Sequence, residues 1–105
     1  MTKASTRYDV DLEVVENTQN MPPPRKFKVS LINDDYTPMD FVVDVLTEVF
    51  FLNQDQAEAV MWQVHEEGKA VCGLYPKDIA LTKVTQVMAL AQEHGHPLLC
   101  LAEEE

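Results

Sequence analysis

The chain has 105 residues, 46% of them hydrophobic, and a formal net charge of -10. Such a length is typical of one domain. The acidic balance argues against binding to nucleic acid or to an anionic membrane, because both need clustered Lys and Arg. It favours basic or amine-bearing partners. No apolar run approaches a membrane span and the N-terminus lacks the apolar core of a signal peptide, so we expect a cytoplasmic protein.

Residues 1–24 predict a flexible N-terminal extension in front of a folded core at residues 25–105. Acidic, hydroxyl and amide side chains dominate the extension, and the cluster around Val10–Val15 is too small to form a core of its own. The proline triplet at 22–24 predicts a stiff, extended end. The extension is either a solvated tail or a tether that is offered to a partner, and its composition leaves both interpretations open.

The first folded element is predicted at Lys26–Asn33, where apolar and polar residues alternate. This pattern indicates a strand that buries Phe27, Val29 and Leu31 on one face. A strand-to-helix corner follows, and it carries the acceptor side chains of Asn33, Asp34 and Asp35.

The helix after this corner has a capping-box-like start, with Thr37 as the N-cap, Pro38 at the first helical position and Asp40 three residues past the cap. We therefore expect a rigid corner whose acceptors could bind a metal ion, a Lys or Arg side chain, or a primary amine.

The rest of the chain shows two helical periodicities after the first one, and two short apolar runs. In order, these patterns predict a helix at about 38–51, an N-cap at Asn53, a helix at 54–67 stopped by Gly68, a strand at 69–75, a helix at about 77–94 ended by Gly95, a strand at 97–102 and a solvated acidic end at 103–105.

The predicted fold class is α+β, with elements in the order βααβαβ. A small three-stranded antiparallel sheet packed against three helices on one face buries every apolar face that the periodicities define. A core of this size leaves little room for a deep catalytic cleft, so we expect a shallow surface pocket.

His65 is one candidate for chemistry, because it lies one helical turn after Met61 and in the last turn of the second predicted helix. Two interpretations are open. His65 is a structural or exposed histidine, or it meets the corner at Asn33 and Asp34 if the second helix packs back beside that corner.

Metal binding and catalysis find little support in the spacing. The histidines, cysteines and corner carboxylates have no zinc-ligand spacing, and the three glycines are too far apart for a phosphate loop. Cys72 and Cys100 lie in apolar runs, so we expect them to be reduced and buried rather than nucleophilic. We expect no cofactor and no enzymatic activity.

Four segments resemble the ClpS family: Val-Ser-Leu-Ile-Asn-Asp-Asp-Tyr-Thr-Pro-Met-Asp-Phe-Val from Val29, Met-Trp-Gln-Val-His from Met61, Gly-Lys-Ala-Val-Cys-Gly from Gly68, and His-Pro-Leu-Leu-Cys from His96. The resemblance covers about Lys26 to Leu101. Its Asn-Asp-Asp-Tyr-Thr-Pro-Met run is highly specific.

The resemblance implies an adaptor that presents substrates with an N-terminal Leu, Phe, Tyr or Trp to the ClpA or ClpC unfoldase of the ClpP protease. Residues that match those binding the substrate's α-amino group are Asn33, Asp34 and His65. Residues that match the side-chain pocket and its rim are Asp35, Thr37, Met39, Val42, Met61, Val64 and Leu98. Residues that match the unfoldase contact are Asp78, which replaces the family's Glu and is one methylene shorter, and Lys83.

Three alternatives remain beside this interpretation. One is a ClpS-like protein with narrower specificity, and another is an enzyme acting on peptide N-termini, such as an aminopeptidase or an aminoacyl transferase. The third is a purely structural module, which would bind no peptide. We expect the free protein to be a monomer.

Overall fold

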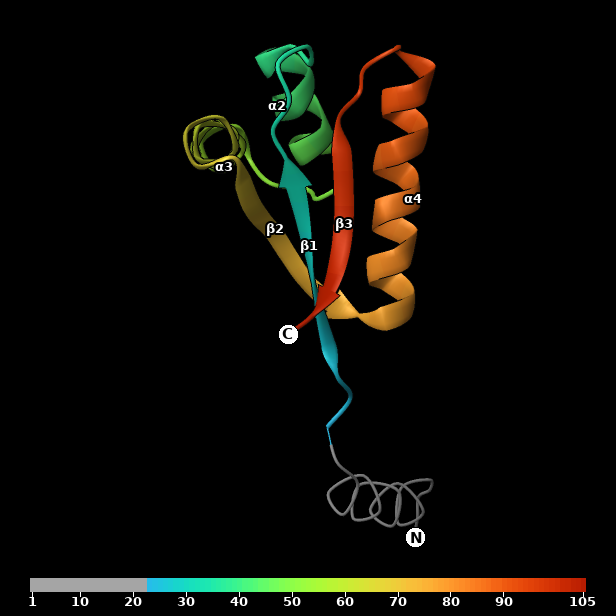
Figure 1. The fold of residues 1–105 in the computed structure, drawn as a ribbon. Coiled ribbons are helices and arrows are strands. Elements are labelled where there is room, and N and C mark those ends of the chain that lie inside the picture. Colours follow the sequence, from blue (N-terminus) through green and yellow to red (C-terminus); the bar gives the residue numbers. More distant parts are fainter. Residues whose placement is uncertain (1–22) are drawn as a thin grey trace, which may run out of the picture.

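The computed structural model describes residues 23–105, and the predicted flexible extension lies almost wholly outside them. The order of elements is βααβαβ, as predicted (Figure 1). The elements are β1 (Lys26–Ile32), α2 (Met39–Glu48), α3 (Gln54–Glu67), β2 (Lys69–Pro76), α4 (Lys77–Glu93) and β3 (Leu99–Glu104).

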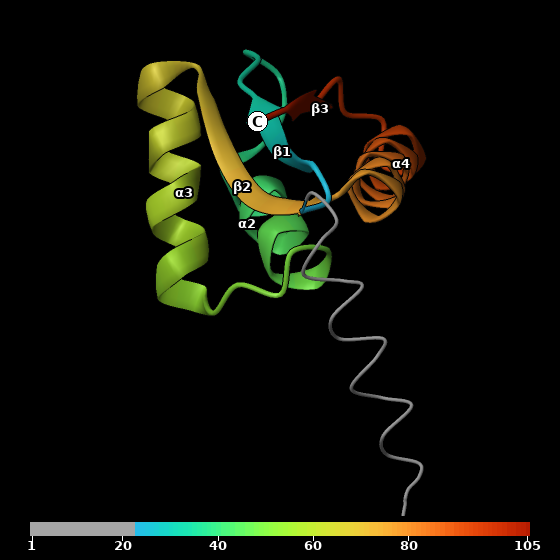
Figure 2. The same cartoon turned by 90° about the horizontal axis from the view of Figure 1, so that it is seen from below.

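The sheet is antiparallel and has β1 at its centre, in the strand order β2-β1-β3. Figure 2 shows α3 and α4 at opposite flanks of the sheet, with α2 between them. The outer face of the sheet stays open, and Val71, Leu74 and Leu99 on it are 44%, 46% and 53% exposed. No helix among residues 23–105 is long and apolar enough to cross a membrane.

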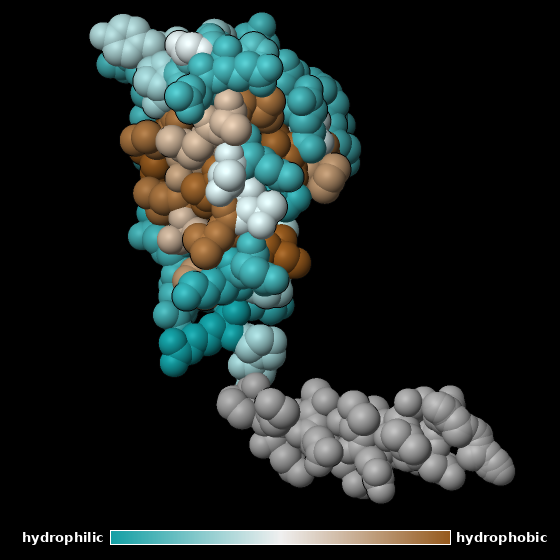
Figure 3. Space-filling model, turned by 90° about the vertical axis from the view of Figure 1, so that its right-hand side faces the viewer, coloured by the Kyte–Doolittle hydropathy of each residue, from teal (hydrophilic) through white to brown (hydrophobic). Residues whose placement is uncertain are grey.

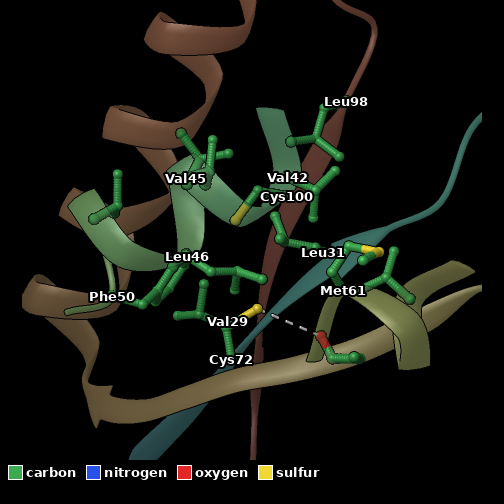
Figure 4. Packing of buried hydrophobic residues seen from close by; sticks show 14 of the residues in the cluster. Val29, Leu31, Val42, Val45, Leu46, Phe50, Met61, Cys72, Leu98 and Cys100 are labelled. Atoms are coloured by element: carbon green, nitrogen blue, oxygen red, sulfur yellow. Dashed lines mark hydrogen bonds between the residues drawn. The ribbon is translucent and has the colours of Figure 1, made fainter. Parts of the chain in front are cut away.

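The core forms where the inner face of the sheet meets the helices. Val29 and Leu31 on β1 are fully buried, as the alternation predicts, and side chains of α2, α3, β2 and β3 converge on them (Figure 4). Cys72 and Cys100 belong to this core and are both free thiols, and the Cys72 thiol donates to the carbonyl oxygen of Ala70 at 3.7 Å.

Helix α3 has the boundaries that the sequence predicts. The Asn53 side chain accepts from the Gln56 amide at 2.8 Å, and the Gln56 side chain accepts from the Asn53 amide at 3.1 Å, which completes a capping box. Gly68 ends the helix in the left-handed region, with φ 86°. Its missing Cβ makes this conformation accessible at low cost.

The predicted start of the first helix is wrong. Helix α2 begins at Met39, Pro38 is the N-cap residue, and no side chain caps the helix. Thr37 is therefore not the N-cap, and no capping box forms with Asp40. The Thr37 hydroxyl donates to Asp34 Oδ2 at 2.6 Å instead. The Thr37 hydroxyl is thus bonded to the carboxylate three residues upstream and does not cap the backbone amides of α2.

The end of α2 also differs from the prediction, because the helix stops at Glu48 and not near residue 51. Phe51 has a φ of 58°, which turns the chain away, and the Leu52 amide closes the end by donating to the Leu46 carbonyl at 3.2 Å. A Phe in the left-handed region is uncommon, so the sequence pattern does not predict that α2 ends at Glu48.

The last strand lies two residues further along the chain than predicted. It pairs with β1 from Ile32↔Leu99 to Phe27↔Glu104. The acidic end is therefore part of the sheet: Glu103 pairs with Lys69 at 2.8 Å and Glu104 pairs with Arg25 at 3.1 Å. These ion pairs supply the opposite charges that let carboxylates occupy strand positions.

We predict that Gly68→Ala lowers the free energy of unfolding by about 1 kcal/mol, because an L-residue is strained at φ 86° even though the added Cβ meets no atom within 4 Å. Chemical denaturation measures the change. Gln63→Ala, on the exposed side of α3, is the control and should change stability by less than about 0.5 kcal/mol. Equal stability of both variants would contradict the strain.

Candidate ligand-binding site

A cavity of about 380 Å³ opens between the corner after β1, the first turns of α2, and α3. The corner contributes polar groups, and the two helices contribute mainly apolar ones. The lining residues are Asn33, Asp34, Asp35, Tyr36, Thr37, Pro38, Met39, Val42, Met61, Val64 and His65. The arrangement gives a small pocket with a polar end and an apolar wall.

The sheet register explains why the corner meets the end of α3. Ile32 is the last residue of β1 and pairs with Lys69, the first residue of β2. The ladder continues one step further, since the Asn33 amide donates to the Gly68 carbonyl oxygen at 2.9 Å. Gly68 is the C-cap of α3, so His65 lies one turn away from it and lines the same cavity as Asn33.

Asp34 organises the corner. Its Oδ1 accepts from the amides of Tyr36 and Thr37, both at 2.8 Å, and its Oδ2 accepts from the Thr37 hydroxyl at 2.6 Å. These bonds fold the loop around the carboxylate in an Asx-type turn.

Asp34 therefore keeps its negative charge. Partial burial raises the pKa of its carboxyl, but the bonds from Thr37 and Tyr36 and the nearby His96 lower it more, so the net shift is downward. An ionised carboxylate at the polar end of the cavity attracts a cationic group.

The apolar wall is continuous with the protein core. Val42, Met61 and Val64 are only 6%, 7% and 2% exposed, and all three belong to the buried cluster. Figure 4 shows Val42 and Met61 within it. Met39 is 37% exposed and lies where α2 begins, at the rim. The wall is therefore held by close packing, whereas the Met39 side chain is only partly covered.

His65 is exposed and lies in the last turn of α3. The Trp62 ring stands edge-on to the imidazole, with 5.8 Å between ring centroids. This contact restricts the imidazole, which can point a ring nitrogen into the cavity.

The structure brings together every residue that the resemblance assigns to the amine and to the side-chain pocket, except Leu98. Leu98 is 2% exposed within the core and lines a separate groove near the start of β3. Two lining residues were missed by sequence reasoning, Tyr36 and Pro38. Both residues lie between Asp34 and Met39 on one tight loop, and this position in the sequence could have indicated that they line the cavity.

Among residues 23–105, no cluster of three or more His, Cys, Asp or Glu side chains is arranged to hold a metal ion. The two thiols are also poorly placed for nucleophilic chemistry. Burial is the main cause that raises the pKa of Cys72 and of Cys100 to about 12, so the reactive thiolate is scarce near neutral pH.

Asp78 and Lys83, the two expected partner-contact residues, lie on α4 and outside the cavity. Asp78 is exposed in the first turn of the helix. Lys83 is half-buried, and its Nζ donates to the Val49 carbonyl oxygen at 2.6 Å and lies 4.6 Å from the centroid of the Phe51 ring. Lys83 thus also fastens the end of α2 to α4.

Comparisons with known proteins agree on one family. The profile described as "ATP-dependent Clp protease adaptor protein ClpS" matches residues 22–101. An ATP-dependent Clp protease adapter protein ClpS of Aromatoleum aromaticum is 52% identical over 101 residues, which are 96% of this chain and 98% of the relative. One of Neisseria gonorrhoeae is 58% identical over 85 residues, 81% of this chain and 82% of the relative.

A solved structure is also similar, that of Agrobacterium tumefaciens ClpS2 bound to L-phenylalaninamide. It superposes with a TM-score of 0.77 at 42% sequence identity, and the match covers 79% of this chain and 100% of the other. Sequence and fold therefore point to the same relatives.

The double role of Lys83 yields a stability prediction. Lys83→Met keeps the aliphatic stem but leaves the Val49 carbonyl without its charged donor, so the free energy of unfolding should fall by about 1–2 kcal/mol. Lys77→Met, which removes an exposed lysine from the same helix, should change it by less than about 0.5 kcal/mol. Thermal and chemical denaturation of both variants measure the difference. Similar values would show that the bond to Val49 contributes nothing.

Proposed function

The chain belongs to the ClpS family of adaptor proteins of the ATP-dependent Clp protease, and we propose that it binds proteins that begin with Leu, Phe, Tyr or Trp and delivers them to a ClpA or ClpC unfoldase for degradation by ClpP. The observation that carries this proposal is the cavity with acceptors at one end and a packed apolar wall beside them. The free thiols in the core fit a reducing compartment such as the cytoplasm.

The polar end suits an α-amino group. A free N-terminus is a compact cation with three N–H donors. The Asn33 side-chain oxygen, the Asp34 carboxylate and a neutral His65 nitrogen offer three acceptors at the polar end of the cavity. Hydrogen bonds to a charged group contribute about 1.5–3 kcal/mol each.

The apolar wall suits the first side chain of a peptide. Burial of one Leu or Phe side chain contributes about 1.5–3 kcal/mol. Part of the combined gain is offset by the cost of association, which leaves an affinity near the micromolar range. L-phenylalaninamide, which is named with the similar solved structure, has both features that the cavity would select: a free α-amine and a bulky apolar side chain.

Delivery requires that substrate and unfoldase bind at the same time. The cavity is built from the corner, α2 and α3, while Asp78 and Lys83 lie on α4 at the opposite flank (Figure 2). The α4 side of the molecule carries an apolar area (Figure 3), and α4 itself exposes the side chains of Ile79, Leu81 and Met88. Such an area is typical of a protein interface.

We predict that Met39 acts as a gate against β-branched first residues. Its side chain lines the cavity and is 37% exposed, and Ile and Val are wide close to the backbone whereas Leu is not. Met39→Ala should therefore strengthen binding of Ile- and Val-initiated peptides by about tenfold and leave Leu-initiated peptides within about threefold. Fluorescence anisotropy with matched peptides measures this. An unchanged order of preference would show that Met39 is simply part of the wall.

We predict that binding weakens on acidification because His65 must be neutral to accept a hydrogen bond. Asp34, whose pKa is lowered, stays ionised throughout the range from about pH 5.5 to 8, so a loss of its charge would not explain the decline. Protonation of the peptide amine works in the opposite direction. A Leu-initiated peptide should bind His65→Ala about tenfold more weakly at pH ~7.5, and this variant should lose the acid-side decline.

Two controls separate the charge from the shape of the site. Acetylation of the peptide N-terminus should reduce affinity at least about 100-fold. Asp34→Asn keeps an oxygen for the amides of Tyr36 and Thr37 but removes the charge, so it should weaken binding less than Asp34→Ala and more than Asn33→Ala. If acetylated and free peptides bind alike, the proposed amine site is wrong. If wild type and His65→Ala lose affinity for the Leu-initiated peptide in parallel as the pH falls, His65 is not the acceptor.

A further inference from the structure

The outer face of the sheet is largely apolar, although no helix among residues 23–105 covers it (Figure 2). In antiparallel sheets with one face in water, the outward residues are usually polar. Val29 and Leu31 of β1 point into the core, so the residues that alternate with them, and the partners of those residues across the sheet, point outward. The outward apolar residues, which we call the outer apolar face, are Ile32, Val71, Leu74, Leu99 and Leu101.

These side chains form a continuous surface and not isolated spots. Ser30 pairs with Val71 on one side and with Leu101 on the other, and it is fully buried although it points outward. Its hydroxyl has no hydrogen-bond partner among residues 23–105. The neighbouring side chains therefore close over Ser30, whereas Val71, Leu74 and Leu99 are themselves 44%, 46% and 53% exposed. A continuous exposed apolar surface is typical of a binding site for another chain segment.

The N-terminal extension carries a segment with the complementary pattern. Residues 9–15 read Asp-Val-Asp-Leu-Glu-Val-Val, and they lie outside the residues that the structure describes. Val10, Leu12 and Val14 alternate with acidic residues, and this alternation predicts a strand with one apolar side. The apolar row is too small to form a core of its own, so it needs an apolar surface elsewhere.

The connection to β1 is long enough to return this segment to the outer apolar face. Residues 16–21 span at most about 20 Å when extended. A stiff proline triplet at 22–24 takes the chain at most about 9 Å away from β1, so about 10 Å remain for the way back. Leu74 is within this reach, because it pairs with Lys28, which lies about 7 Å from the start of β1. So short a tether keeps the segment at an effective concentration in the millimolar range.

Charge favours this segment over a second copy of the chain. Lys26 and Lys28 alternate with the inward residues of β1, so they stand on the same side as the outer apolar face, at its end near the connection. A docked segment brings its acidic residues close to these lysines. Two copies of the chain would each carry a net charge of -10, which opposes their association. The chain's own extension is therefore the occupant that fits best.

We propose that residues 10–14 dock as an extended strand on the outer apolar face of their own chain, with Val10, Leu12 and Val14 packed against it. This surface is separate from the peptide cavity, because no cavity residue lies on β2 or β3. The inference is therefore independent of the proposed function. Docking holds the extension beside the core, so a partner that takes hold of the extension must first release it from the sheet.

A spin label on the segment tests the contact in the full chain. Glu13→Cys carries a nitroxide, whereas burial raises the pKa of Cys72 and of Cys100 to about 12 and makes the native thiols slow to react. The nitroxide should weaken the amide NMR signals of Val71 and Leu99 at least about twofold relative to its reduced, diamagnetic form. Equal signals in the two forms would overturn the proposal.

Matched variants of the labelled chain separate docking from the mere proximity of a tail. Leu12→Ser removes a side chain of the apolar row, and it should recover at least about half of the lost Val71 and Leu99 signals. Val15→Ser removes an apolar side chain that lies next to the row but outside it, so it should leave the loss of signal unchanged. Both substitutions leave residues 23–105 intact. An equal effect of the two would contradict a docked face set by the alternation.

A mixture of chains identifies the source of the docked segment. Spin-labelled chain without isotope enrichment is mixed with unlabelled chain that is isotope-enriched for NMR. The signals of Val71 and Leu99 should stay unchanged, because docking takes place within one chain. Their loss in the mixture would show that the segment binds a second copy, and it would overturn the proposal.

Discussion

The hydrogen bond from the Asn33 amide to the Gly68 carbonyl is the contact on which the site depends. It extends the β1–β2 ladder by one step beyond Ile32↔Lys69 and so joins the corner after β1 to the C-cap of α3. Gly68 must be left-handed for α3 to end there and β2 to begin at once. The register of a sheet that mainly serves the core thereby sets the distance between Asn33 and His65, which lie on different elements.

The corner combines structural and functional tasks in a single side chain. Asp34 uses its oxygens to fold the loop through Tyr36 and Thr37, and the same bonds keep it ionised. The apolar half of the cavity is likewise an extension of the core, through Val42 and Val64. A pocket built in this way is preorganised, so little binding energy is lost in ordering it. Met39 and Tyr36, which are 37% and 81% exposed, are lining residues that packing does not fix in this way.

The element order, the core faces and the caps Asn53 and Gly68 follow from the sequence, because periodicity and capping residues carry that information. One specific resemblance gives every residue of the cavity except Tyr36 and Pro38, and it wrongly adds Leu98. The remainder depends on tertiary contacts. A left-handed Phe51, the capture of the Thr37 hydroxyl by Asp34, and the bond from Lys83 to Val49 are settled by neighbours distant in the chain or by local competition between acceptors.

The central claim is that this chain selects its ligands by their first residue. The most direct measurement is a calorimetric or anisotropy titration of the full chain with peptides that differ only at that residue. The account predicts micromolar or tighter binding for Leu, Phe, Tyr and Trp, and affinities at least about tenfold weaker for Ala, Ser and Glu. Equal affinities across the series, or no binding of any member, would contradict it.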